Sequence, residues 1–135
     1  MRREEIMELR HISHAASLPL QTYDLEGPEQ RRLIRWLPIR YDRATGCGSY
    51  YFQMLPGAVT TPHRHPRYEE FFVIAGEAIE SDGTVLRAGD FISFAPGSDH
   101  FTRSETGCLL IVVEWSPEAT PASDNAGGGA GTLHP

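Results

Sequence analysis

The chain has 135 residues, a net charge of -6 and 40% hydrophobic residues, enough for one domain with a single core. No run approaches the ~18 apolar residues that span a bilayer, and the first residues lack an apolar signal-peptide core. We therefore expect a cytoplasmic protein that does not bind a membrane. All 12 basic residues are arginine. The acidic balance disfavours nucleic-acid binding, and the absence of lysine excludes Schiff-base and P-loop chemistry.

Residues 1–31 show no clean periodicity. EEIMEL is compatible with a short helix or an edge strand, and the proline- and glycine-bearing stretch after it is typical of loops and turns. We expect an N-terminal segment of strand and loop. This segment and the apolar strand RLIRW are the two candidates for a subunit contact.

Residues 32–116 alternate short β-type runs with turns. The runs are RLIRWLPIRY, SYYFQML, EEFFVIAGEAIE, VLRAGD, FISFA and CLLIVVEW. About seven or eight short strands without a long helix indicate an all-β domain, a sandwich or a barrel. Cys47 and Cys108 lack CxxC spacing and are expected to be thiols in or near strands. Residues 117–135 are rich in Gly, Ala, Pro and Ser, which predicts a flexible tail.

The stretch 57–76 concentrates residues that can hold a metal. His63 and His65 are two apart, so in a strand both imidazoles point to one face while Arg64 points away. Glu69 follows beyond a proline-bearing turn, and an extended entry into the next strand is one way to return its carboxylate to the same interior. Paired histidines and a glutamate inside a barrel are costly unless they are coordinated.

The direction of Glu69 fixes the faces of the strand that follows it. If Glu69 faces inward, alternation places Phe71, Val73 and Ala75 on the inner face and Glu70 on the outer face. Imidazole nitrogen and carboxylate oxygen together suit Fe(II), Mn(II), Ni(II) or Zn(II).

The spacing of these residues resembles the first motif of the cupin superfamily, G(X)5HXH(X)3,4E(X)6G. Its positions are filled by Gly57, His63, His65, Glu69 and Gly76.

The second cupin motif, G(X)5PXG(X)2H(X)3N, is matched by Gly89, Gly97 and His100. Ala95 stands where the first proline is expected, and Ser104 replaces the final Asn. Neither position is a ligand, but the loss of Asn changes the hydrogen bonding behind the site.

The resemblance implies an all-β fold, a single-domain cupin-type (RmlC-like) jelly-roll β-barrel over residues 32–116. It implies one divalent metal, Fe(II), Mn(II), Ni(II) or Zn(II), with open positions for water, dioxygen or substrate. The implied ligands are His63, His65, Glu69 and His100. The amino-acid sequence across the two motifs is most similar to that of small bacterial ChrR-type cupins, which are commonly homodimers.

The resemblance leaves three functions open. The first is a metal-dependent enzyme acting on a small molecule, an Fe(II) dioxygenase in the first place, with isomerase or lyase chemistry on the same ligands as an alternative. The second is a ChrR-like sensor or binding module, although the sequence has no HxxxCxxC-like zinc motif. The third is a structural or storage role.

Three further side chains are candidate catalytic residues. Tyr68 precedes Glu69, and Tyr51 and Gln53 lie on the strand before the first motif. Phenol and amide groups can orient a substrate or transfer a proton, although strand aromatics more often pack between sheets. Thr102 and Ser104 share the parity of His100 and are expected to face the cavity. Arg64 or Arg67 at the barrel mouth would attract an anionic substrate, with a plain surface position as the default.

Overall fold

The computed structural model describes residues 1–14, 20–25 and 32–117. In these residues one short helix, α1 (Arg3–Leu9), precedes a series of β-strands. The strands are β1 (Gln21–Thr22), β2 (Ile34–Asp42), β3 (Cys47–Met54), β4 (Ala58–Val59), β5 (His63–Arg64), β6 (Tyr68–Glu80), β7 (Val85–Arg87), β8 (Phe91–Phe94), β9 (Asp99–His100), β10 (Thr102–Ser104) and β11 (Cys108–Trp115). The all-β prediction is confirmed.

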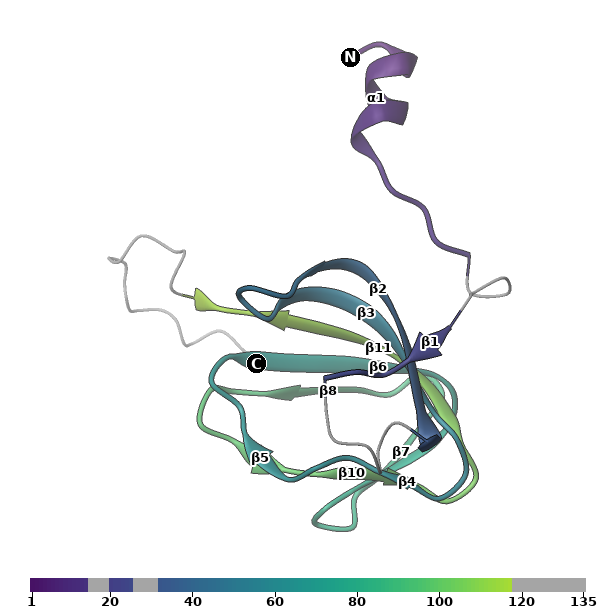
Figure 1. The fold of residues 1–135 in the computed structure, drawn as a ribbon, viewed down its shortest axis with the longest axis vertical. Coiled ribbons are helices and arrows are strands. Elements are labelled where there is room, and N and C mark those ends of the chain that lie inside the picture. Colours follow the sequence, from purple (N-terminus) through teal and green to yellow (C-terminus); the bar gives the residue numbers. More distant parts are fainter. Residues whose placement is uncertain (15–19, 26–31, 118–135) are drawn as a thin grey trace.

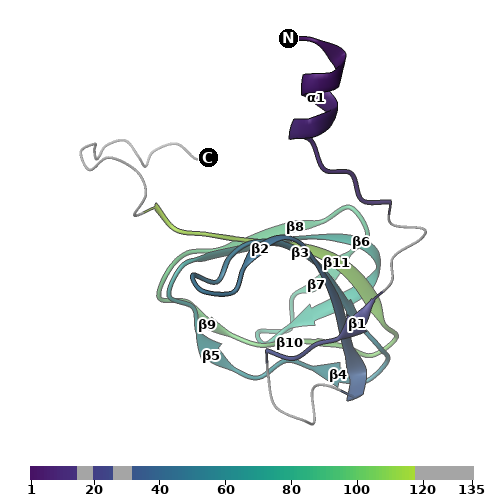
Figure 2. The same cartoon turned by 45° about the horizontal axis from the view of Figure 1, so that its top comes forward.

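The strands form one large curled sheet and one small sheet. The large sheet has the order β1-β2-β3-β11-β6-β10-β4, and β7 and β8 also pair with β6. Figures 1 and 2 show how this sheet wraps around an interior. The small sheet pairs β5 with β9. Strand β6 is the centre of the fold because β11, β10, β7 and β8 all pair with it.

The core lies on the concave face of the large sheet. Alternate side chains of β2, β3, β6 and β11 point to this face, as the period of two in a strand requires. Its largest buried aromatic, Trp36, is 1% exposed and meets Tyr23 and Tyr50 edge-on, each at a ring-centroid distance of 5.3 Å. The other members include Ile34, Phe52, Met54, Phe71, Val73, Leu110 and Val112.

A β-bulge in β6 changes which residues face the core. Phe71 and Val73 are buried, as the alternation predicts, but Ala75 is exposed, and the prediction for Ala75 is wrong. The pairing with β11 shifts between Val73 and Ala75, which leaves Ile74 as an extra residue. An extra residue reverses the alternation beyond it. As a result, Glu80 at the far end of β6 is buried.

The N-terminal segment contains both a helix and a strand. EEIMEL lies within α1, which resolves the alternative in favour of a helix, and no residue of α1 is buried. Figure 1 shows this helix apart from the sheet. Strand β1 joins the sheet edge by pairing with β2. The predicted tail lies outside the described residues except for Pro117. No helix in the described part of the chain has the length and apolarity to cross a membrane. Cys47 and Cys108 are free thiols.

Candidate metal centre

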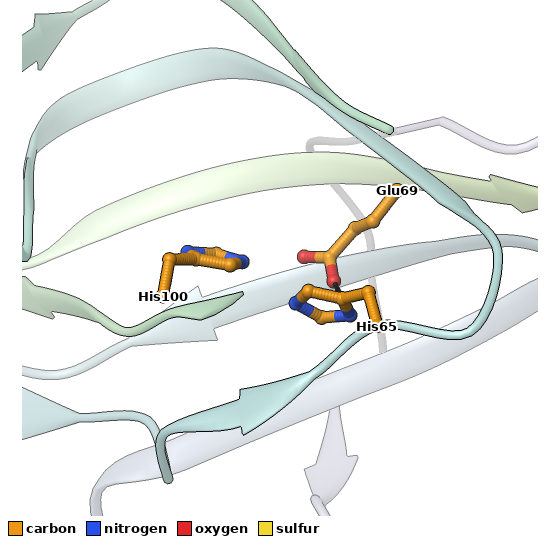
Figure 3. A group of neighbouring side chains, drawn as sticks. All are labelled: His65, Glu69 and His100. Carbon is orange, nitrogen blue, oxygen red and sulfur yellow. Dashed lines mark ion pairs between the residues drawn. The ribbon is translucent and has the colours of Figure 1, made fainter. Parts of the chain in front are cut away.

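Three side chains from separate parts of the chain converge in the interior. His65 follows β5, Glu69 lies near the start of β6, and His100 ends β9. Each offers one ligand atom, and these atoms lie within 4.8 Å of one another. Figure 3 shows the Glu69 carboxylate directed at the His65 ring, with the His100 ring to one side of both. The structure thus contains a His/Glu/His group that can hold a metal ion.

Backbone pairing of the two motifs brings the histidines together. His63 pairs with His100 in the β5–β9 sheet. One step further, the amide of His65 donates to the Ser98 carbonyl at 2.9 Å, and the amide of Gly97 donates to the His65 carbonyl at 2.8 Å. The turn around Gly97 is therefore fixed directly against the first motif.

His65 and Glu69 form a buried pair. Nδ1 of His65 lies 2.8 Å from Oε1 of Glu69, and their side chains are 6% and 14% exposed. Burial lowers the pKa of His65, but the hydrogen bond and the negative charge of Glu69 outweigh it, so the pKa is raised above its ordinary value. A proton on His65 offsets the negative charge of the Glu69 carboxylate, and a bound metal cation would offset the same charge.

His100 is held by a second carboxylate behind it. Nδ1 of His100 lies 2.8 Å from Oε1 of Glu80, and the Thr102 hydroxyl donates to Oε2 of Glu80 at 2.5 Å. The ring also stacks on Phe94 at a centroid distance of 3.8 Å. Such a carboxylate–histidine contact fixes the tautomer, so Nδ1 carries the proton and Nε2 keeps its lone pair for a ligand.

The two buried imidazoles fit a metal ion. Nε2 of His65 and Nε2 of His100 are both buried and have no hydrogen-bond partner. An unsatisfied buried polar atom costs about 1–3 kcal/mol, and coordination would satisfy both atoms. Two imidazoles and a carboxylate are a donor set that borderline divalent transition metals accept.

His63 lies beside His65 but is not one of the three residues whose ligand atoms lie within 4.8 Å of one another. Its ring centroid is 4.5 Å from that of His65, and Nδ1 lies 2.7 Å from the Thr61 carbonyl oxygen. Nδ1 is therefore the protonated nitrogen in the neutral ring, and Nε2 is the atom available to a metal. Its role as the fourth ligand stays a prediction.

A cavity of about 220 Å³ opens beside the three side chains. Its apolar wall comes from the concave face of the sheet, with Phe52, Phe71, Leu110 and Val112 among its members. Its polar wall comprises Thr60, His63, His65, Arg67, Glu69, His100, Thr102 and Glu114. Thr102 faces the cavity as its parity predicts. Ser104 is buried behind it, where its hydroxyl donates to the Glu77 carbonyl at 2.6 Å.

The three catalytic candidates do not line this cavity. Tyr51 and Gln53 alternate with Tyr50 and Phe52, and it is the latter two that line it. Tyr68 stacks on Trp115 at a centroid distance of 4.2 Å. The catalytic roles of Tyr51, Gln53 and Tyr68 stay predictions without support from their positions.

Sequence reasoning missed three polar residues around the cavity. Glu80 supports His100, and Tyr50 donates its hydroxyl to Glu114 at 2.6 Å. Burial, followed by the charges of Glu114 and Glu69, raises the pKa of Tyr50 well above its ordinary value. Glu114 was visible in principle, because a single glutamate shares the parity of the apolar positions 110 and 112 in CLLIVVEW. Glu80 was not, because the bulge reverses its parity.

Comparison with known proteins identifies the fold and the family. The family model of the ChrR Cupin-like domain matches residues 20–118, and the chain belongs to this family. It is thus a cupin, as the two motifs suggested. The search of curated proteins gave no significant match.

Solved structures agree on the fold. An RmlC-like cupin from Shewanella frigidimarina is 23% identical, with a TM-score of 0.60 over 78% of this chain and 89% of that chain. The complex of Rhodobacter sphaeroides SigE with the anti-sigma ChrR matches at 14% identity and a TM-score of 0.59, over 76% of this chain and 51% of that chain. The polyketide cyclase RemF from Streptomyces resistomycificus matches at 18% identity and a TM-score of 0.63, over 78% of this chain and 79% of that chain. At these identities the likeness establishes the fold alone.

Proposed function

We propose that this cupin is a mononuclear metal-dependent enzyme that acts on a small molecule, with dioxygenase-type chemistry at Fe(II). The observation that supports this proposal best is that Nε2 of His65 and Nε2 of His100 are buried without a hydrogen-bond partner, in a group with Glu69 beside a cavity of about 220 Å³. A binding pocket with convergent polar groups on an apolar wall is typical of small-molecule sites.

The proposed ligands are His63, His65, Glu69 and His100, and the chain's other residues orient them and shape the cavity. Glu80, which accepts from the Thr102 hydroxyl, holds the His100 ring, and the concave face of the sheet supplies the apolar part of the cavity wall. A bound divalent metal would supply Lewis-acid activation of substrate oxygens, and Fe(II) would add redox chemistry with dioxygen. Small β-diketones, enols and hydroxyketones are the substrate class we propose.

The experiment begins with the metal content of protein purified from its own host, by elemental analysis. Oxygen uptake is then measured with Fe(II)-loaded protein against a panel of β-diketones, enols and hydroxyketones. We expect oxygen uptake with at least one compound of the panel. The Glu69→Gln variant should lose this uptake, and the Glu70→Gln variant should retain it. Glu70 is the matched control because it lies on the opposite face of the same strand, bonded to Ser93. Absence of uptake across the panel rejects the dioxygenase.

Isomerase or lyase chemistry would use the same ligands. Its signature is conversion of a panel member without oxygen, detected by mass spectrometry of the products. This outcome would retain the metal enzyme and replace the dioxygenase reaction.

A ChrR-like sensor or binding module is the second proposal, and the family match favours it. One structural neighbour is a complex of a sigma factor with the anti-sigma ChrR. A sensor predicts a stoichiometric regulator bound to the chain together with inert chemistry on the whole panel. Turnover without such a regulator would reject it.

We further propose a homodimer through the convex face of the sheet. The strand RLIRW is a poor interface candidate, because Ile34 and Trp36 lie in the core. The convex face instead exposes four large apolar side chains, each at least 38% exposed: Phe72, Phe91, Val113 and Trp115. Exposed apolar patches of this kind mark interaction surfaces.

The charges at the sides of this face favour a second copy as its partner. Arg40 is exposed on β2, and Glu70 lies on β6, with β3 and β11 between these two strands. A two-fold axis along the strands would set the arginine side of one copy over the glutamate side of its partner.

A further inference from the structure

A second polar cluster lines the cavity beside the candidate metal centre. The Tyr50 hydroxyl donates to Oε2 of Glu114 at 2.6 Å, and Nη1 of Arg67 donates to Oε1 of Glu114 at 2.9 Å. The Glu114 and Arg67 side chains are 11% and 23% exposed. All three residues line the same cavity as His65 and Glu69. None of them is required to hold a metal.

The negative charge of Glu114 is neutralised within the cluster, separately from the negative charge of Glu69 among the proposed metal ligands. Glu114 on β11 pairs directly with Glu69 on β6, and directly opposed residues place their side chains about 4.5–5.5 Å apart at Cβ. Two adjacent carboxylates would repel each other without counter-charges. Glu69 has His65 as its partner, and Glu114 has Arg67. The interior therefore contains two adjacent ion pairs, His65 with Glu69 and Arg67 with Glu114, each of which offsets its own charges.

The turn between β2 and β3 packs against Arg67 and holds it in place. Gly46 in this turn has φ +75°, and a Cβ added there would lie 2.7 Å from Nη2 of Arg67. A side chain at this position would displace the guanidinium. Arg67 is thus preorganised between a glycine on one side and Glu114 on the other, which lowers the cost of ordering it on binding.

We propose that Arg67, Glu114 and Tyr50 bind a neutral hydroxyl group of the substrate, one that is distinct from its metal-binding oxygens. This inference rests on the proposed small-molecule function for its link to turnover, but the binding itself does not require a metal. The substrate class is then a small hydroxyl-bearing molecule with an apolar body.

The hydrogen-bonding capacity of the cluster favours a hydroxyl. Each Glu114 oxygen accepts one hydrogen bond from the cluster and retains acceptor capacity, Tyr50 Oη can still accept, and Arg67 has five N–H donors in all. A hydroxyl both donates and accepts and can use both kinds of partner. Arg67 and Glu114 compensate each other's charge, so the cluster has no net charge that would favour a carboxylate or an ammonium over a neutral group.

The test uses metal-free full-length protein and two probes of the same shape, phenol and toluene. Dissociation constants come from protein-observed NMR, with the Arg67 side-chain Nε–H resonance as the local reporter. We expect wild type to prefer phenol and to shift the Arg67 resonance. The ratio of the toluene to the phenol dissociation constant should fall about tenfold in Tyr50→Phe, and fall likewise in Glu114→Gln, because a site built for a hydroxyl discriminates against its absence.

Glu70→Gln is the matched control, since Glu70 lies on the opposite face of β6 from the cavity, where it accepts a hydrogen bond from Ser93. It should leave the ratio unchanged. A ratio unaltered in both Tyr50→Phe and Glu114→Gln would overturn the proposal, even if their melting temperatures fall, since that result indicates a purely structural cluster. Absence of a phenol preference in wild type would overturn it too. Failure of oxygen uptake would leave this result untouched.

Discussion

At the residue scale, the candidate metal centre depends on a residue that is not itself a ligand. Glu80 accepts from His100 and from Thr102, and its side chain is 5% exposed. A carboxylate behind a ligating imidazole fixes the ring and raises its basicity. Glu80 is therefore a positioning residue, and its effect should appear in metal affinity.

We expect Glu80→Gln to weaken metal binding about 10–100-fold, because contacts behind a ligand contribute on this scale. Competition against a chromogenic chelator measures the affinity directly. Glu70→Gln removes a carboxylate from the same strand on the convex face, bonded to Ser93, and should leave affinity unchanged. Equal affinities in Glu80→Gln and wild type would show that His100 needs no such support.

The sequence reveals the candidate ligands much better than their surroundings. The spacing of His63, His65, Glu69 and His100 is a fixed pattern that needs no knowledge of parity. The neighbours of the site depend on which face each strand turns inward. In SYYFQML aromatics occupy both faces, so composition alone does not separate Tyr50 from Tyr51.

At the scale of elements, Gly76 permits the close approach of β6 to the turn before β11. It has φ +82°, and a Cβ added there would lie 2.2 Å from the Gly107 carbonyl oxygen. The first cupin motif includes this glycine, and the structure gives its physical reason. The bulge at Ile74, just before it, has no comparable sequence signature.

Gly76→Ala should lower the free energy of unfolding by about 3 kcal/mol or more, because strained φ and a backbone clash act together. Gly83→Ala is the control: its φ is +90° but a Cβ there meets nothing within 4 Å, so it should cost only about 1–2 kcal/mol. Urea unfolding measures both. Equal losses would mean that conformation, and not close packing, explains Gly76.

At the scale of the whole molecule, the convex face bears on assembly. We expect the wild-type chain to be a dimer and Phe72→Glu to be a monomer, because a charge on β6 would be buried without a partner. Light scattering on size-exclusion fractions gives the mass. Val59→Glu, on β4, introduces the same charge at a site of similar exposure, 44% against 40% for Phe72, and should remain dimeric. A monomeric wild type would refute the interface.

The β5–β9 sheet has a further consequence for how fast an ion enters and leaves. It consists of two residues on each strand and is separate from the large sheet, whereas β6 pairs with four strands. Hydrogen exchange of the His65 amide, which donates to Ser98, should therefore proceed by local opening, while amides in β6 exchange only with global unfolding. Loss of an ion would follow the faster process, with His65 moving away while Glu69 and the His100 ring held by Glu80 stay in place.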